Sequence, residues 1–160
     1  MNILVAVDDS EFAYYIANFV AAHEWPADSS FVLLHVLPSL LPVMASLPSN
    51  VIEDLSEGQN QAAKRLLDRV ASKIKKKGYL VDQEISEGDA KSKILSWARK
   101  IDADVIVMGS HGRAGVERWI LGNVSLSVAS SAHCSVLIVR PPAPAKHETR
   151  KTESKEKELV

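Results

Sequence analysis

Short apolar runs alternate with longer segments of helical spacing along most of this chain, and this alternation restricts the possible folds more than any other feature. Three of the runs are nearly continuous Val, Ile and Leu, which is typical of strands buried on both faces of a parallel sheet. Because another run carries Asp82, Gln83 and Glu84, we expect it at an edge of the sheet. The predicted strands cover residues 3–7, 31–36, 80–85, 105–108 and 136–139.

Apolar residues spaced three or four apart predict a helix between each pair of successive strands. Gly78 after the second stripe suits a left-handed helix cap, and the third and fourth stripes begin after Asp89 and Gly122. Trp97 is expected in the core and Trp25 is expected to be partly exposed. Right-handed crossovers fold such units into a doubly wound α/β domain, a five-stranded parallel sheet with helices on both faces. The four stripes cover residues 12–20, 63–74, 94–101 and 124–132.

Two segments do not fit this alternation. Residues 37–49 carry Pro38, Pro42 and Pro48 among small and apolar residues, which predicts a long mobile loop, not a helix, placed to cover a ligand. Residues 141–160 are Pro-rich and then rich in Lys, Glu, Thr and Ser, a composition that cannot offset the entropy of ordering. We therefore expect a folded domain over residues 1–140 and a disordered charged tail over 141–160.

The charge of the chain is nearly balanced. A formal net charge of −1 gives no global electrostatic case for nucleic acid or for an anionic membrane surface, and we expect neither as a partner. The first apolar run lacks a basic leader and is broken by Asp8, which argues against a signal peptide or a membrane span. The single cysteine, Cys134, excludes an internal disulfide, so we expect a cytoplasmic protein.

A glycine-rich loop follows the fourth predicted strand and leads into the last helix, with glycines at 109, 112, 115 and 122. Glycines let the backbone turn and approach a ligand closely, and the free amides of a following helix N-terminus favour anions. In open parallel sheets, ligands bind beyond the carboxyl ends of the strands. That rule adds Asp8 and the main chain of Val36 to the loop, so we expect a phosphorylated small molecule at this edge.

Each of these residues also has a simpler interpretation. Asp8, beside Asp9 and Ser10, is a possible cap for the first helix. The glycines are possible turn formers, and Ser125 is either a phosphate ligand or an ordinary serine of a first helical turn. Arg113 lies in the loop, where contact with phosphate and solvent exposure are equally expected.

Residues 1–140 resemble the nucleotide-binding branch of the universal stress protein family. The first strand and turn, residues 3–10, are similar to those of the family, as are Leu34-His35-Val36 and Glu87-Gly88-Asp89. The most specific likeness is to the family pattern G-x-x-G-x9-G-[S/T], which Gly109, Gly112 and Gly122 match. The chain departs from the pattern at Asn123, whose amide can still donate a hydrogen bond.

The resemblance implies a Rossmann-like sheet of the adenine nucleotide alpha hydrolase type, with strand order 3-2-1-4-5. It implies ATP as the ligand, with Mg or Mn. From the residues themselves we expect no catalytic and no metal-ligating residue. Asp8 and the backbone of Val36 would contact adenosine, Met108 would lie near the base, and loop amides would hold the phosphates. It also implies a homodimer through residues 135–140. The expected cofactor-binding residues are Asp8, Val36, Met108, Gly109, Gly112, Arg113, Gly122, Asn123, Val124 and Ser125.

Three classes of function are compatible with these features. The first is a regulatory or stress-response module that holds ATP. The second is a slow ATP hydrolase, for which the chain offers no P-loop lysine and no paired acids in the loop, so we expect slow turnover at most. The third is a dimeric scaffold that binds no nucleotide and in which the glycines are structural.

Overall fold

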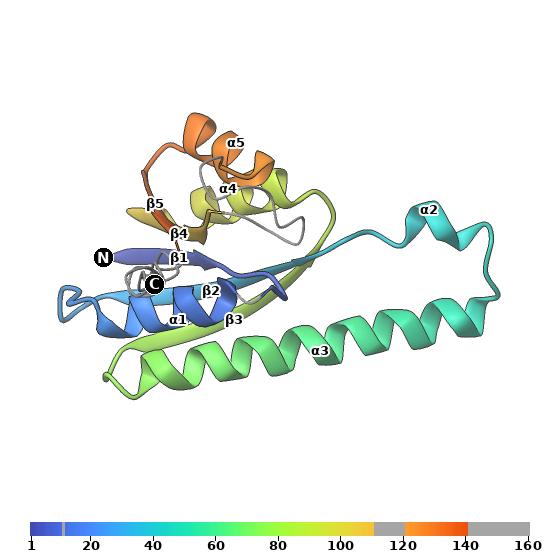
Figure 1. The fold of residues 1–160 in the computed structure, drawn as a ribbon, viewed down its shortest axis with the longest axis horizontal. Coiled ribbons are helices and arrows are strands. Elements are labelled where there is room, and N and C mark those ends of the chain that lie inside the picture. The colour runs from blue at the N-terminus through green and yellow to red at the C-terminus, as the bar shows by residue number, and fades with distance from the viewer. Residues whose placement is uncertain (11, 111–120, 141–160) are drawn as a thin grey trace, which may run out of the picture.

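The computed structural model describes residues 1–10, 12–110 and 121–140. Over these residues the chain forms a five-stranded parallel sheet in the order β3-β2-β1-β4-β5 (Figure 1). The predicted strands, their order and the edge position of the third strand are confirmed. The strands are β1 (Asn2–Ala6), β2 (Ser30–Leu37), β3 (Leu80–Glu87), β4 (Val105–Gly109) and β5 (Ser135–Val139).

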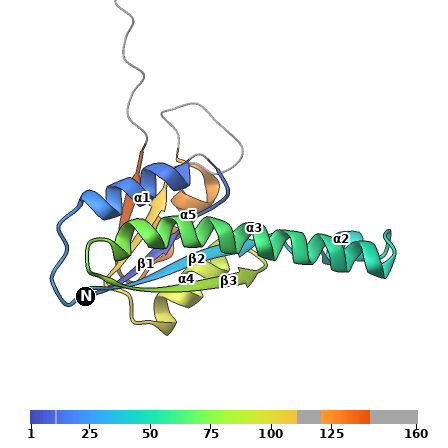
Figure 2. The ribbon, with the colours of Figure 1, turned by 90° about the horizontal axis from the view of Figure 1, so that it is seen from below.

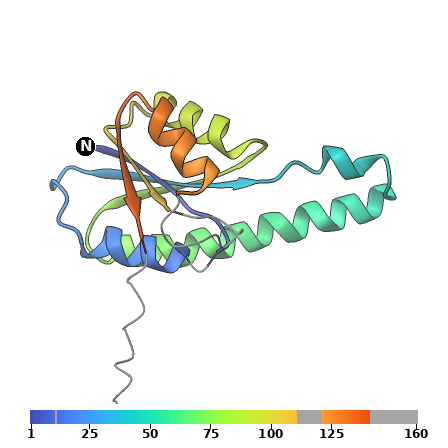
Figure 3. The ribbon, with the colours of Figure 1, turned by 45° about the horizontal axis from the view of Figure 1, so that its top comes forward.

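Helices cover both faces of this sheet. In Figure 3, α1 and α3 lie on one side of the strands, and α4 and α5 lie on the other. The short helix α2 stands apart from the sheet near the start of α3 (Figure 1). In the described part of the chain, no helix has both the length and the apolar character needed to cross a bilayer. The helices are α1 (Phe12–Ala22), α2 (Leu41–Met44), α3 (Ser49–Lys75), α4 (Ala90–Lys100) and α5 (Asn123–Ser131).

Side chains of the central strands alternate between two apolar cores. Ile3 and Val5 of β1 are fully buried against α1 and α3, whereas Leu4 between them is fully buried against α4 and α5. Successive side chains of a strand point to opposite faces, so a strand covered on both faces must be apolar at every position. This is the physical reason why unbroken Val, Ile and Leu runs predicted the sheet.

The predicted helix ends are also found. Gly78 has φ of +88°, and its amide donates to the carbonyl of Lys75 at 2.9 Å, which ends α3 as expected. Asp89 caps α4 by accepting from the Ser92 amide at 2.9 Å and from the Ser92 hydroxyl at 2.6 Å. These bonds to Ser92 lower the pKa of the Asp89 carboxyl. A carboxylate in this position also suits the positive end of the helix dipole.

Residues 37–49 differ from the prediction, because part of the expected loop is the helical turn α2. Pro42 is its second residue, where a missing N–H costs nothing because first-turn amides have no intrahelical partner. Helix α3 then begins directly after Pro48, whose carbonyl accepts from the Val51 and Ile52 amides at 3.1 and 3.2 Å. The helix therefore starts well before the stripe at residues 63–74, and its first half projects beyond the sheet (Figure 2).

Two tryptophans correct the predicted pattern of exposure. Trp25 was expected to be partly exposed, but it is buried and its indole N–H donates to the Val20 carbonyl at 2.9 Å. Its ring lies edge-on to Phe31 of β2 and also contacts the His23 ring, which stacks on Phe19 of α1, so α1 and β2 share one aromatic cluster. Trp97 packs against the core on the α4 and α5 side, as expected, but it is only half-buried, and its indole N–H donates to the Ser86 hydroxyl at 2.8 Å.

Candidate functional site

The carboxyl ends of β1, β2 and β4 lie side by side. Ala6 is in register with Leu34 on one side and with Met108 on the other. Two residues further along the chain, Asp8 lies past the end of β1 and Val36 lies in the part of β2 that extends beyond β1, where it still pairs with Ser86 of β3. Gly109 is the last residue of β4. The structure thus brings together the two predicted adenosine contacts and the start of the predicted phosphate loop.

Asp8 is half-buried, and its Oδ1 accepts from both the amide and the hydroxyl of Ser10, the amide at 3.2 Å. The Ser10 hydroxyl oxygen in turn accepts from the Phe12 amide at 3.2 Å. Ser10, and not Asp8, therefore supplies the side chain that caps the start of α1. A carboxylate has about four acceptor positions over its two oxygens, so Asp8 can accept further hydrogen bonds from hydroxyl groups.

His35 is a buried polar residue of this edge to which the sequence pattern gave no role beyond its place at the end of β2. Its side chain is buried, with 2% exposed, and its Nδ1 lies 2.8 Å from the Val7 carbonyl oxygen. A carbonyl oxygen only accepts, so Nδ1 carries the proton and, in the neutral ring, Nε2 keeps its lone pair. A histidine inside the apolar run Leu33-Leu34-His35-Val36 was the available signal.

The contact of His35 lies where the pairing between β1 and β2 ends. The Val7 amide donates to the Leu34 carbonyl at 3.0 Å, and among the described residues this is the last main-chain bond between the two strands. The peptide groups of every second strand residue point to the same side. Because those of Leu34 point toward β1, those of Val36 do so as well. Beyond Val7, the Val36 peptide groups therefore face the space beside Asp8.

Two hydrogen bonds hold the ends of the β4–α5 loop together. The Gly122 amide donates to the Ser110 carbonyl at 2.8 Å, and the Ser125 hydroxyl donates to the Gly109 carbonyl at 2.7 Å. Ser125 is buried, with 3% exposed, so its hydroxyl fixes the start of α5 against the end of β4. The predicted contacts Gly112 and Arg113 lie outside the described residues.

The start of α5 points its amides toward this edge. The helix begins at Asn123 after Gly122, with no side-chain cap, and its first internal bond runs from the Leu126 amide to the Gly122 carbonyl at 2.9 Å. The amides of Asn123, Val124 and Ser125 therefore have no acceptor within the helix. Such amides, together with the helix dipole, form a site for a negatively charged group.

The apolar residues of the site lie on the α4 and α5 side of the sheet. Met108 is buried, with 5% exposed, and Val36 is half-buried against the same core. Cys134 also packs there, and burial raises the pKa of its thiol, which keeps it protonated at neutral pH. Within the described ranges, no three His, Cys, Asp or Glu side chains gather in a way that could hold a metal ion.

The sequence matches known proteins over the whole of this domain. A family model described as the universal stress protein family matches residues 1–140. The universal stress protein MJ0531 of Methanocaldococcus jannaschii is 37% identical over 142 residues, which cover 89% of this chain and 71% of that protein. The universal stress protein Sll1388 of Synechocystis is 27% identical over 149 residues, covering 87% of this chain and 97% of that protein.

Solved structures share the fold. The hypothetical protein MJ0577 superposes with a TM-score of 0.77 at 25% identity, covering 89% of this chain and 96% of that one. A universal stress protein from Archaeoglobus fulgidus in complex with dAMP gives 0.60 at 23%, covering 87% and 97%. A family member from Arabidopsis thaliana with AMP bound gives 0.65 at 19%, covering 89% and 93%. Sequence match, strand order and sheet agree: the chain belongs to the universal stress protein family.

Proposed function

We propose that the protein binds an adenine nucleotide, ATP with Mg or Mn, and acts as a regulatory module with slow or no hydrolysis. One observation carries the proposal. The Asp8 carboxylate, the main chain of Val36 and the first-turn amides of α5, which have no acceptor within the helix, meet at one edge of the sheet. Carboxylate, peptide group and helix N-terminus are suited to a ribose hydroxyl, a base edge and a phosphate, in that order.

The adenosine half lies between β1 and β2 in this proposal. Asp8 accepts from the ribose hydroxyls, and the peptide groups of Val36 pair with the adenine edge because the main-chain pairing with β1 has ended before them. Met108 supports the base from the core side. The relatives solved with dAMP, AMP and cAMP support an adenine nucleotide as the ligand class.

The phosphates lie at the start of α5. Because the Gly122 amide donates to Ser110, the amides of Asn123 and Val124 are the main phosphate donors among the described residues. Ser125 sets their position through its bond to Gly109 and does not need to touch the phosphates. Gly112 and Arg113 remain predicted contacts from the loop. Mg²⁺ is commonly held by phosphate oxygens and water with few protein ligands, so the nucleotide would bring it.

The proposal includes a homodimer through residues 135–140 and a cytoplasmic location. Strand β5 is an edge of the described sheet, and its residues Val136, Leu137 and Ile138 are only half-buried. Half-buried apolar residues on an edge strand favour pairing with another strand. Sedimentation at micromolar concentration tests the dimer, and a monomer alone would contradict it.

The nucleotide is tested on freshly purified protein, denatured in acid and analysed by chromatography and mass spectrometry. We expect ATP or ADP at about one molecule per chain, or, if it is lost in purification, a stabilisation of about 2.7 kcal/mol by Mg·ATP at about 100 times its dissociation constant. Asp8→Asn should weaken binding by about 10- to 100-fold because a charged acceptor is lost. Asp28→Asn, an exposed residue before β2, is the matched control and should bind normally.

Two outcomes would contradict this proposal. An empty protein that Mg·ATP does not stabilise would favour the dimeric scaffold. Turnover faster than about 1 s⁻¹ would place the protein among enzymes, not binding modules.

A further inference from the structure

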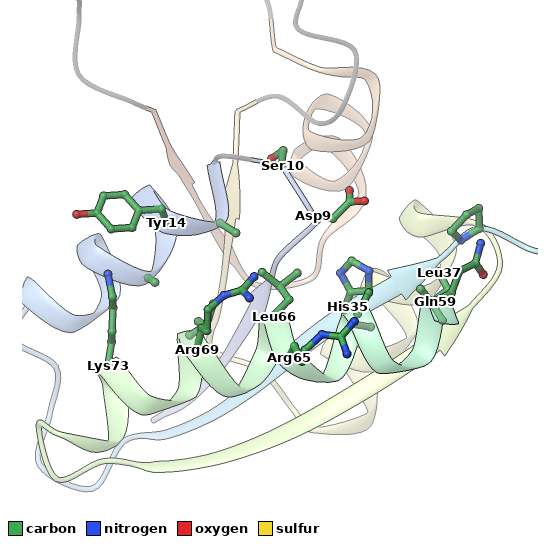
Figure 4. A pocket seen from close by; sticks show the side chains of 16 residues that line it. Asp9, Ser10, Tyr14, His35, Leu37, Gln59, Arg65, Leu66, Arg69 and Lys73 are labelled. Carbon is green, nitrogen blue, oxygen red and sulfur yellow. The ribbon is translucent and has the colours of Figure 1, made fainter. Parts of the chain in front are cut away.

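A groove separates α1 from α3 on one face of the sheet, and Figure 4 shows the side chains that line it. Its volume is about 480 Å³, within the range of small-molecule sites. Short side chains make the space, because Ala13 and Ala17 of α1 lie across from Ala62 and Ala63 of α3. Apart from charged residues at its margins, the lining is mostly apolar. We call it the α1–α3 groove.

Three basic residues of α3 border the groove at every fourth position: Arg65, Arg69 and Lys73. Lys73 has partners, since its Nζ donates to Asn18 Oδ1 at 2.6 Å and lies 4.1 Å from the centre of the Tyr14 ring. It therefore joins the two helices at one end of the groove. In the described part of the chain, the exposed guanidinium groups of Arg65 and Arg69 form no ion pair or hydrogen bond.

This arrangement is unfavourable for the empty protein. Like charges four residues apart on a helix repel each other. Arg65 and Arg69 form one such pair, and Arg69 and Lys73 form another. The acid that lines the groove, Asp9, comes from the β1–α1 connection and not from α3. An anion bound beside Arg65 and Arg69 would relieve the repulsion.

We propose that the α1–α3 groove binds a small amphipathic carboxylate, with its apolar body along Ala13, Leu66 and Val70 and its carboxylate on Arg65 and Arg69. A planar guanidinium matches a carboxylate with two parallel hydrogen bonds. The volume fits a short acyl chain, whereas an α-helix of about 10 Å diameter needs a longer and wider groove. One end of the groove reaches Ser10 and His35, next to the strand ends proposed for the nucleotide, whereas the proposed carboxylate ligands Arg65 and Arg69 lie on α3.

The test compares octanoate with 1-octanol, which has the same chain length and no charge, by isothermal titration calorimetry on the full chain. We expect octanoate to bind about tenfold more tightly or better. Arg65→Gln with Arg69→Gln should remove that preference while 1-octanol binding stays unchanged. Arg99→Gln, an exposed arginine on α4, is the matched control and should keep the preference. Octyl phosphate tests the head group, because guanidinium groups also bind phosphate with two parallel hydrogen bonds and only tighter binding of octanoate supports a carboxylate ligand.

A second variant tests the place of binding. Ala17→Leu fills the groove from α1 and should abolish octanoate binding, with circular dichroism to confirm that the variant is folded. Equal binding of octanoate and 1-octanol, no binding at millimolar concentration, a preference for octyl phosphate, or the same loss in Arg99→Gln would overturn the proposal.

Separate results would contradict the nucleotide proposal and the groove proposal. Octanoate affinity should be the same with and without saturating Mg·ATP. Competition between the two would assign the groove to the nucleotide site and overturn the inference. If the protein binds octanoate but not Mg·ATP, the groove proposal stands and only the nucleotide proposal is contradicted.

Discussion

The two halves of α3 are parts of one continuous helix, yet they are stabilised in different ways. The second half packs on the sheet and contains all the buried residues of this helix: Ala63, Leu66, Leu67, Val70, Ala71 and Ile74. The first half projects beyond the sheet (Figure 2) and is held by bonds along its own surface, such as Asn60 Nδ2 to the Ser56 carbonyl at 2.9 Å. Most helical stability in proteins comes from packing an apolar face. The regular helical geometry of α3 therefore does not show how stable each half of the helix is.

Hydrogen exchange should show the largest difference between the halves. Amides of the second half should exchange only through global unfolding, which costs about 5 to 15 kcal/mol in a domain of this kind. Amides between residues 52 and 60 should exchange through local fraying at a small fraction of that cost. Mass spectrometry of peptides from each half measures this, and equal protection would show that something covers the projecting half.

Truncation of one leucine in each half gives the next largest effect. Leu67→Ala should lower the free energy of unfolding by about 2 to 5 kcal/mol, because the Leu67 side chain is 1% exposed and its truncation leaves a cavity. Leu55→Ala is the matched control, with 43% exposed, and should change it by less than about 0.5 kcal/mol. Urea denaturation measures both, and a large loss at Leu55 would reveal a packing partner.

The two glycines of this region should respond to alanine with opposite signs. Gly78→Ala should destabilise the protein by about 1 to 2 kcal/mol, because φ of +88° is strained for a residue with a Cβ. Gly58→Ala meets no atom within 4 Å and should strengthen the projecting half by about 1 kcal/mol. Thermal unfolding measures the loss of stability in Gly78→Ala. Slower hydrogen exchange in the projecting half measures the gain in Gly58→Ala. A fall in helicity with Gly58→Ala would contradict this view of the projecting half.

The smallest effect concerns a side-chain bond of the projecting half. Gln61 Nε2 donates to Glu57 Oε1 at 3.0 Å, one helical turn apart on the exposed surface. Gln61→Ala removes this bond, worth about 0.2 to 0.5 kcal/mol, and should speed local exchange slightly without moving the urea midpoint. A shifted midpoint would mean that the two halves unfold together.

The contrast also explains what the sequence could predict of the fold. The second half of α3 was found because burial imposes an apolar stripe on the sequence, and the strands were found for the same reason. The first half has no buried face, and Pro42 and Pro48 at its approach favour a loop on composition alone. It is helical because it continues the helix that the buried second half forms. No local sequence pattern shows this.

The candidate site divides in a similar way. The positions of Asp8 and Val36 were predictable because parallel strands end at one edge, and the glycine spacing indicated the loop. The bond from Ser125 to Gly109 was not, because it joins residues 16 apart in sequence whose side-chain directions depend on how α5 packs. The bond from His35 to Val7 spans 28 positions and was missed for the same reason.

The early end of the β1–β2 pairing at Val7 has a consequence for evolution and for protein engineering. A recognition edge made from peptide groups does not depend on the identity of the side chain at position 36, which only has to fit the core. In the proposed nucleotide site, residue 36 is then free to drift among apolar types while the preference for the nucleotide is inherited unchanged. Altering that preference by design would require moving the backbone, for example at His35, and not replacing the residue in contact.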